Sequence, residues 1–511
     1  MKKQSLIKGT FVLGVAGIVA KFLGLFFRWP LQMLIGDEGV GYYQMSFPLY
    51  MFFIAAASGI PVAVSKMVSE RNAVNDHEGV MQVLKKAMML MFILGAGFTG
   101  ILLIFSRPII AFLKWDEKSY YSLVAIAFAP IFISVMSAFR GFFQGLQNMN
   151  YTAISQIIEQ VGRVIVGVGL AYVLLPRGIE YSAGGAALGA AAGGLFGGGY
   201  LLIKYIKVRK EFKVNVVRDN IDIMNKLLYI AIPVSLGAAV SSIMSLIDSA
   251  VVPQKLLQAG FSYKQATILY GQLTGKAFIM INVPLTLSAA LCASLMPIIA
   301  EAHVLNRRHE VVSKVDLAIK LSMVMALPSF LGLYNLAYPI LDLIFPGQSA
   351  GFKILQYSAI SIPFIILAQT STAILQGVGQ YVMPIVNLAI GCVIKTVITM
   401  QMVSIPGINI YGAVLGSICG YVIASGLNMV LLKRKLRVNI RWFDTMIKPA
   451  FASIIMIIIV VIIYMNVYNY SMSSRIACLI AIFSAIIIYS ILIFVFKVFK
   501  YDYIKNRFFR R

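Results

Sequence analysis

The stretch IACLIAIFSAIIIYSILIFVFKVF, residues 476–499, runs for 24 residues with one charged side chain, Lys497. A helix that crosses a bilayer needs about 20 consecutive apolar residues, so this stretch is long enough to span a membrane. Similar runs recur throughout the 511-residue chain, of which 60% is hydrophobic and only 12% charged. A soluble protein carries roughly 25% charged residues. The sequence therefore predicts an all-α polytopic membrane protein, and it excludes a soluble enzyme, a secreted disulfide scaffold and a disordered polymer.

Fourteen such runs are expected along the chain, separated by short polar breaks. They lie at about 6–34, 43–68, 83–106, 120–145, 154–176, 184–206, 225–252, 270–299, 317–343, 352–376, 382–404, 409–433, 445–468 and 476–499. The breaks leave no room for a soluble catalytic domain.

A faint internal repeat indicates how these helices are grouped. Gln144-Gly145 matches Gln376-Gly377 at an offset of 376 − 144 = 232 residues, and the same offset places Arg163 on Lys395. This pattern predicts two parallel six-helix halves, related by an axis along the membrane normal, followed by two extra helices and a basic tail. The three predicted parts are residues 1–215, 216–437 and 438–511.

The basic residues are unevenly distributed among the loops. The chain has 44 Lys and Arg against 19 Asp and Glu, a net charge of +25. Roughly 30 of the basic residues fall in one alternating set of loops and tails and roughly 8 in the other, as the positive-inside rule describes. We therefore expect both termini in the cytoplasm, anionic membrane lipids as partners of the cytoplasmic basic loops, and no nucleic-acid partner.

Conventional catalytic patterns are missing from the sequence. Residues Gly271–Ala277 resemble a phosphate-binding loop, but the motif is one residue short, ends in alanine and lies in an apolar run, so no nucleotide site is expected. The histidines His77, His303 and His309 lack the spacing of a metal site. We expect no metal and no cofactor, and the identity of any coupling cation stays open.

A glycine-rich run contains Gly185, Gly189, Gly193 and Gly197. A spacing of four residues places these glycines on one face of a helix, where small side chains allow two helix backbones to approach closely. The pattern predicts close helix packing and indicates nothing about a substrate.

The most informative residues are charges inside apolar runs. Six are cationic, namely Lys21, Arg28, Arg140, Arg163, Lys276 and Lys395. Two are anionic, Glu159 and Asp248. A charge at the bilayer centre costs about 2.5–3.5 kcal/mol unless it faces a partner or water. The excess of four positive charges predicts a water-filled cationic cavity for an anion, and a pyrophosphate suits arginine because of bidentate hydrogen bonding.

Several of these residues have alternative interpretations. Arg140 lies near the cytoplasmic end of its run, where it could extend to the membrane surface or line the cavity. Glu159 and Arg163 are spaced i,i+4 and are expected to pair, in a structural or a functional role. Asp248 could hold a coupling cation or pair with a lysine of the cavity.

Longer motifs in the same regions resemble a known family. These are RGFFQGLQNM at 140–149, EQVGRV at 159–164, IGDEGVGY at 35–42 and GIPVAVSK at 59–66. Together with the fourteen expected spans, they resemble the stage V sporulation protein B-like polysaccharide transporters of the multidrug/oligosaccharidyl-lipid/polysaccharide exporter superfamily, which are related to lipid II flippases.

The resemblance implies a flippase of the bacterial cytoplasmic membrane that works by alternating access. Its implied substrate is an undecaprenyl-pyrophosphate-linked saccharide, in particular the peptidoglycan precursor lipid II for the spore cortex. The implied site is a cationic central cavity for the pyrophosphate, and the last two helices would form a groove for the polyprenyl tail. Lys21 lies where such flippases carry an arginine in the first helix.

The expected function is therefore that of a transporter rather than an enzyme. Two other functions are considered. A multidrug/cation antiporter of the same fold would have buried carboxylates dominating its cavity. A non-transporting membrane scaffold for cell-wall enzymes would need its basic loops and could dispense with the intramembrane cations.

Overall fold

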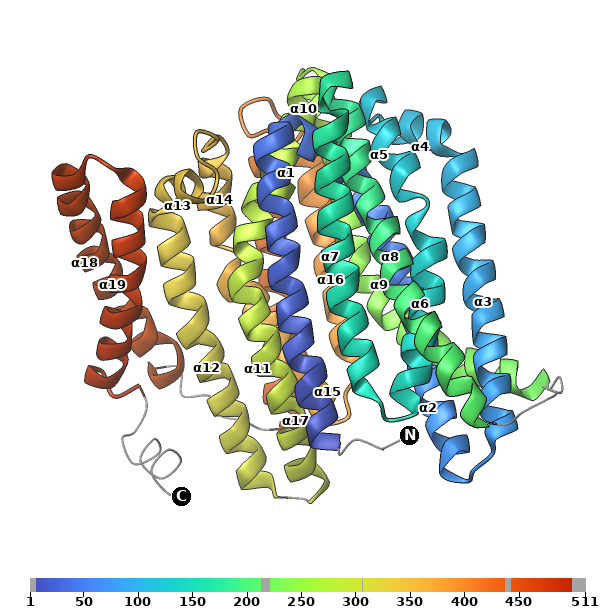
Figure 1. Cartoon of the computed structure of the whole chain (residues 1–511). Helices are drawn as coiled ribbons and strands as arrows, with labels where there is room; N and C mark the ends of the chain where they lie inside the picture. The colour runs from blue at the N-terminus through green and yellow to red at the C-terminus, as the bar shows by residue number, and fades with distance from the viewer. Residues whose placement is uncertain (1–5, 213–220, 306, 437–442, 499–511) are drawn as a thin grey trace. The chain divides into compact units, whose positions relative to one another are not determined.

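The structure is a computed structural model that describes residues 6–212, 221–305, 307–436 and 443–498. Every regular element within those ranges is a helix (Figure 1). The chain forms two compact units, Met1–Gly271 and Gln272–Arg511, called unit 1 and unit 2 below.

Unit 1 contains ten α-helices and three short 3-10 turns in its described residues. The α-helices are α1 (Leu6–Ala57), α2 (Gly59–Ala73), α3 (His77–Ile104), α4 (Ser106–Leu113), α5 (Tyr120–Ile126), α6 (Ala129–Gly145), α7 (Met149–Leu174), α8 (Ile179–Arg209), α9 (Ile221–Gln258) and α10 (Tyr263–Gly271). The 3-10 turns are η1 (Glu117–Ser119), η2 (Leu175–Arg177) and η3 (Lys210–Phe212).

Unit 2 begins with a short π-helix, η4 (Gln272–Ala277), and has a second one, η5 (Phe443–Ile447). Its described α-helices are α11 (Phe278–Val304), α12 (Arg308–Asn335), α13 (Ala337–Ile344), α14 (Phe352–Ala359), α15 (Ile362–Gly377), α16 (Val382–Met402), α17 (Tyr411–Leu436), α18 (Lys448–Ser471) and α19 (Ser474–Val495). The helices α18 and α19 pack against each other, and α18 also contacts α12.

The helices are long and apolar enough for a membrane protein. Among the described residues, 11 helices could cross a bilayer, or up to 12 if α14 and α15 form one span bent by 45°. Many large apolar side chains are exposed on α19, including Phe483, Ile486 and Ile487, each more than 60% exposed. Such a surface suits lipid rather than water, so the chain is a multi-pass membrane protein. The count of fourteen spans stays a prediction.

Helix boundaries recur at the offset found in the sequence. Tyr120 begins α5 and Phe352 begins α14, while Gly145 ends α6 and Gly377 ends α15, both at an offset of 232. The compact units are divided elsewhere than the predicted halves, because unit 1 also includes α9 and α10. These two helices pack against α1, and α9 also packs against α2.

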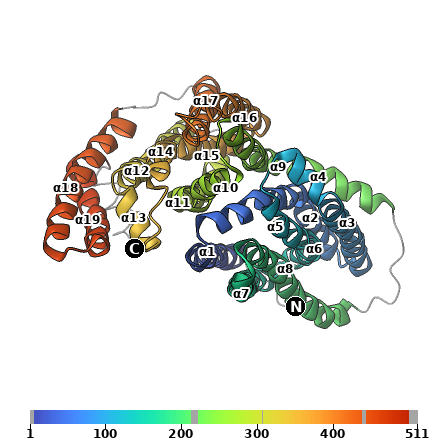
Figure 2. The same ribbon diagram turned by 90° about the horizontal axis from the view of Figure 1, so that it is seen from above.

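The helix α7 of unit 1 carries two charged residues of the candidate site, Glu159 and Arg163. The view in Figure 2 shows α7 beside both α1 and α8, and all three are in direct contact. The α1 helix is interrupted at Gly36, where φ is +61° and ψ is −168°. Glycine adopts this backbone conformation without a steric penalty, so the chain turns there and continues as a second helical arm.

Candidate functional site

The two arms of α1 bring an arginine against a row of aromatic rings. Arg28 of the first arm lies over the ring of Phe47 in the second arm, at 5.9 Å from its centroid. Tyr43, Phe47 and Tyr50 form a continuous row, with centroids 5.4 and 5.6 Å apart. The rings align because residues four and three apart share one face of a helix.

Helices α6 and α7 add a buried ion-pair network. Arg140 donates from Nη2 to Glu159 Oε2 at 3.0 Å and from Nε to Ser155 Oγ at 2.9 Å. Arg163 Nη2 lies 3.6 Å from the other oxygen of the same carboxylate, Glu159 Oε1. The side chains of Arg140, Glu159 and Arg163 are 16%, 11% and 14% exposed. The single carboxylate of Glu159 therefore forms ion pairs with two arginines, and all three side chains are largely shielded from solvent.

Tyr50 joins the two groups of side chains. Arg163 donates from Nη2 to the Tyr50 hydroxyl at 2.9 Å, and its guanidinium carbon lies 5.8 Å from the centroid of the same ring. Arg28 and Arg163 both interact electrostatically with the hydroxyl of Tyr43, and they repel each other. We call the whole group the arginine cluster, and it consists of Arg28, Tyr43, Tyr50, Arg140, Glu159 and Arg163.

The arginine cluster has more positive than negative charge. It holds three guanidinium groups and one carboxylate, and Arg28 makes no ion pair with any described residue. In the described part of the chain, Nε of Arg163 is buried and lacks a hydrogen-bond partner. A buried donor without a partner costs about 1–3 kcal/mol. An anion that accepts from Arg163 and balances Arg28 would relieve both deficits.

The glycine face of α8 holds α7 in position, as the sequence spacing predicted. A Cβ atom on Gly189 would lie 2.8 Å from the carbonyl oxygen of Arg163. One on Gly193 would lie 2.7 Å from the carbonyl oxygen of Glu159. These distances are too short for any side chain larger than hydrogen, so the glycines let the α8 backbone contact α7 directly behind the two charged residues.

The other predicted site residues are not among the members of the arginine cluster. Asp248 is buried in α9 of unit 1 and interacts electrostatically with Tyr270 of α10. Lys21 is in the first arm of α1, and its side chain lies outside the described part of the structure. Lys276 and Lys395 are in unit 2, on η4 and α16, and both are buried.

Lys276 has its own ligands within unit 2. Its Nζ donates to the carbonyl oxygens of Gln348 at 2.6 Å and Ala350 at 3.1 Å, both in the connection between α13 and α14. The residue is fully buried. Backbone carbonyls thus compensate part of its charge, and its predicted role in substrate binding stays a prediction.

The structure brings together four of the predicted residues, Arg28, Arg140, Glu159 and Arg163. It places Arg140 in an ion pair with Glu159, whereas the sequence suggested that it extends to the membrane surface or lines a cavity. Sequence reasoning missed the tyrosines of the cluster. Their spacing, with Tyr43 and Tyr50 seven residues apart around Phe47, was a detectable signal of a shared helix face. No group of three His, Cys, Asp or Glu side chains in the described residues is placed to hold a metal ion.

Comparison with known proteins identifies the family. The family model described as "Polysaccharide biosynthesis protein" matches residues 6–303. The chain belongs to this family. A family relative, the stage V sporulation protein B of Bacillus subtilis (strain 168), is 30% identical over 99% of this chain and 98% of its own length.

A second relative and a solved structure extend the likeness. The lipid II flippase MurJ of Bacillus subtilis (strain 168) is 27% identical, over 84% of this chain and 83% of its own length. A structure of the lipid II flippase MurJ in an inward closed conformation superimposes with a TM-score of 0.73, covering 95% of this chain and 99% of that one at 16% identity. The family member described here therefore shares the fold of that flippase.

Proposed function

We propose that this chain is a flippase of the bacterial cytoplasmic membrane and not an enzyme. Its proposed substrate is an undecaprenyl-pyrophosphate-linked saccharide, the peptidoglycan precursor lipid II, and its proposed role is in synthesis of the spore cortex. The names of the two Bacillus relatives support this substrate and this role. The observation that carries the proposal is the buried excess of positive charge in the arginine cluster.

The arginine cluster suits a pyrophosphate in charge and in geometry. Guanidinium groups bind phosphate oxygens through two parallel hydrogen bonds, and these charge-assisted bonds are about twice as strong as neutral ones. Arg28 and Arg163 would provide the donors. Glu159 would hold Arg163 while the site is empty, since its carboxylate is only 3.6 Å from the guanidinium, and would give it up when the substrate anion arrives.

The rest of the predicted mechanism is part of the same proposal. Lys21, Lys276 and Lys395 are further predicted contacts of the anion, and Asp248 is the predicted site of a coupling cation. We propose fourteen spans, arranged as two six-helix halves and two extra helices, with both termini in the cytoplasm. The antiporter alternative requires carboxylates to dominate, and the cluster has one carboxylate against three arginines.

The test is lipid II translocation in reconstituted vesicles. Arg28→Ala and Arg163→Ala should each lower the initial rate at least tenfold, because each removes a donor to the pyrophosphate. Arg177→Ala is the matched control, since it removes the same charge from an exposed position directly after α7. Its rate should stay within twofold of that of the wild type.

Three outcomes separate the hypotheses. Wild-type translocation that survives both substitutions would keep the flippase and reject the arginine cluster as its site. Wild-type protein that binds and moves no lipid II would reject the proposed substrate. Complementation of a deletion strain by Arg28→Ala and Arg163→Ala, together with failure of complementation by variants of the basic loops, would replace the flippase function by the scaffold function.

A further inference from the structure

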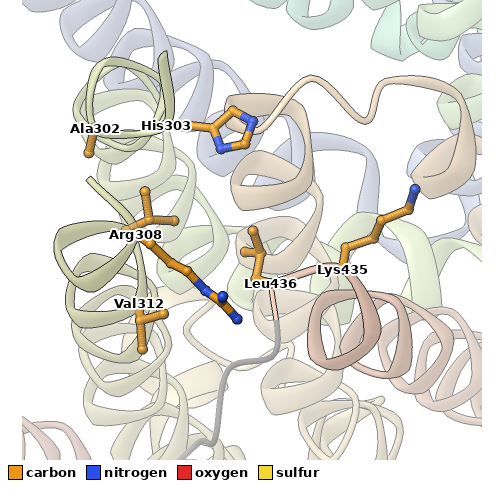
Figure 3. A pocket seen from close by; sticks show the side chains of 7 residues that line it. Ala302, His303, Arg308, Val312, Lys435 and Leu436 are labelled. Atoms are coloured by element: carbon orange, nitrogen blue, oxygen red, sulfur yellow. The ribbon is translucent and has the colours of Figure 1, made fainter. Parts of the chain in front are cut away.

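A basic pocket lies at the ends of three helices in unit 2 and shares no residue with the arginine cluster. Its cavity is about 310 Å³, near the lower end of the roughly 300–1,000 Å³ range of small-molecule sites. Figure 3 shows His303 and Arg308 on one side and Leu436 and Lys435 on the other. Val311 and Val312 complete the apolar part of the lining.

Among the described residues, no acidic side chain forms an ion pair with the basic side chains of this pocket. Neither Arg308 nor Lys435 makes an ion pair with any described residue, and His303 makes none either. The nearby acid Glu310 is already shared by Arg307 at 3.6 Å and Lys314 at 3.7 Å. The pocket therefore has two permanent positive charges and an imidazole that can donate a hydrogen bond.

The backbone adds to this positive field. Arg308 is the first residue of α12, and the preceding Arg307 supplies no side-chain cap to the helix. The first N–H groups of an α-helix have no partner within the helix, and the helix dipole favours an anion at that end. Arg308 and Lys435 both line the pocket, and the α12 helix that Arg308 begins adds the positive end of its dipole on the Arg308 side.

The helix ends and the apolar lining of the pocket limit the kind of anion that it could bind. The helix α11 ends at Val304, α12 begins at Arg308 and α17 ends at Leu436. Two of these helices, α12 and α17, are long and apolar enough to cross a membrane. The ends of a helix that spans a bilayer are expected near the lipid headgroups. The pocket also combines charged side chains with the apolar Val312 and Leu436, which matches a molecule with a phosphate and a hydrocarbon part.

We propose that this pocket binds the phosphodiester headgroup of an anionic membrane lipid such as phosphatidylglycerol. Arg308 holds two phosphate oxygens, Lys435 and His303 donate to the headgroup, and Val312 and Leu436 contact the first carbons of the acyl chains. Bound in this way, the lipid links the start of α12 to the end of α17. The inference does not depend on the substrate that the protein transports.

The experiment measures binding of fluorescent phosphatidylglycerol to the purified full chain in phosphatidylcholine nanodiscs. The double variant Arg308→Gln/Lys435→Gln should bind at least tenfold more weakly than the wild type. The matched control is Lys207→Gln/Arg209→Gln, which removes one lysine and one arginine from exposed positions on α8. The control should change the affinity less than twofold. Equal losses in the two double variants would show diffuse surface attraction and overturn the pocket.

Two further measurements sharpen the result. Val312→Phe fills the pocket and keeps every charge, so it should also weaken binding at least fivefold, and unchanged binding would overturn the site. Glycerol 3-phosphate, added as a soluble competitor, should displace little lipid at millimolar concentration because it lacks the acyl chains. Displacement as effective as that by unlabelled phosphatidylglycerol would keep the phosphate chemistry and overturn the lipid as its source.

Discussion

Two helix pairs of the molecule share one packing register and differ in their chemistry. In unit 1, glycines of α8 contact the backbone of α7, and in unit 2, glycines of α17 contact the backbone of α16. A Cβ on Gly189 would lie 2.8 Å from the carbonyl oxygen of Arg163, and one on Gly416 would lie 2.8 Å from that of Lys395. The two cations are 395 − 163 = 232 residues apart, which is the offset of the repeated helix boundaries.

The chemistry changes at the positions around those cations. At an offset of 232, Glu159 corresponds to Gly391 and Arg140 to Thr372. The charged network of unit 1 is thus replaced by amides and hydroxyls. Asn387 Nδ2 donates to Asn428 Oδ1 at 2.9 Å, and Asn428 Nδ2 lies 3.1 Å from the Thr372 hydroxyl and 3.2 Å from that of Ser371. The comparison teaches that glycine contacts fix the backbones, while the side chains on the same helices are free to diverge.

The largest effect is expected when the charged network is broken. Glu159→Ala leaves Arg140 and Arg163 buried without a carboxylate, and removing one partner of a buried ion pair costs about 3–5 kcal/mol. The free energy of unfolding in detergent, measured by denaturant titration, should fall by that amount. Thr372, which corresponds to Arg140, takes part in a hydrogen bond between neutral side chains, so Thr372→Ala should cost less than half as much. Equal losses would mean that the two networks contribute alike.

The next effect tests the shared register. Gly193→Ala places a methyl group 2.7 Å from the Glu159 carbonyl oxygen, and Gly420→Ala places one 2.7 Å from that of Gly391. Overpacking of this kind costs about 1–3 kcal/mol, and thermal unfolding should show similar losses in the two variants. Gly199→Ala is the control, because no atom lies within 4 Å of its added Cβ. Because alanine has a higher helix propensity than glycine, the control should be unchanged or slightly stabilised, and a loss as large as in the other two would show that the backbone contacts do not determine the result.

The smallest effect is expected in the neutral network of unit 2. Hydrogen bonds between membrane helices contribute about 0.6 kcal/mol on average and up to about 1.7 kcal/mol. A double-mutant cycle of Asn387→Ala and Asn428→Ala should give a coupling energy in that range. A coupling of 3 kcal/mol or more would place the neutral network on a level with the charged one and remove the difference between the two regions.

Much of the fold followed from local patterns. The apolar runs predicted spanning helices, and the four-residue glycine spacing predicted a close helix contact, which α8 makes with α7. The spacing of Glu159 and Arg163 predicted their pairing, which the structure shows at 3.6 Å. These features are visible in sequence because helical periodicity is a property of consecutive residues.

The remaining features required the tertiary structure. Arg140 pairs with Glu159 across a sequence separation of 19 residues. The hydroxyl of Tyr50 accepts from Arg163 across a separation of 113 residues, and Lys276 donates to two backbone carbonyls more than 70 residues further along the chain. No local pattern encodes such partners, because they meet only after separate helices have packed together. The sequence by itself determined which residues are helical, apolar and charged. The tertiary structure decided which buried charges are compensated, because the electrostatic energy of a charge in a low-dielectric interior depends on the groups that other helices place beside it.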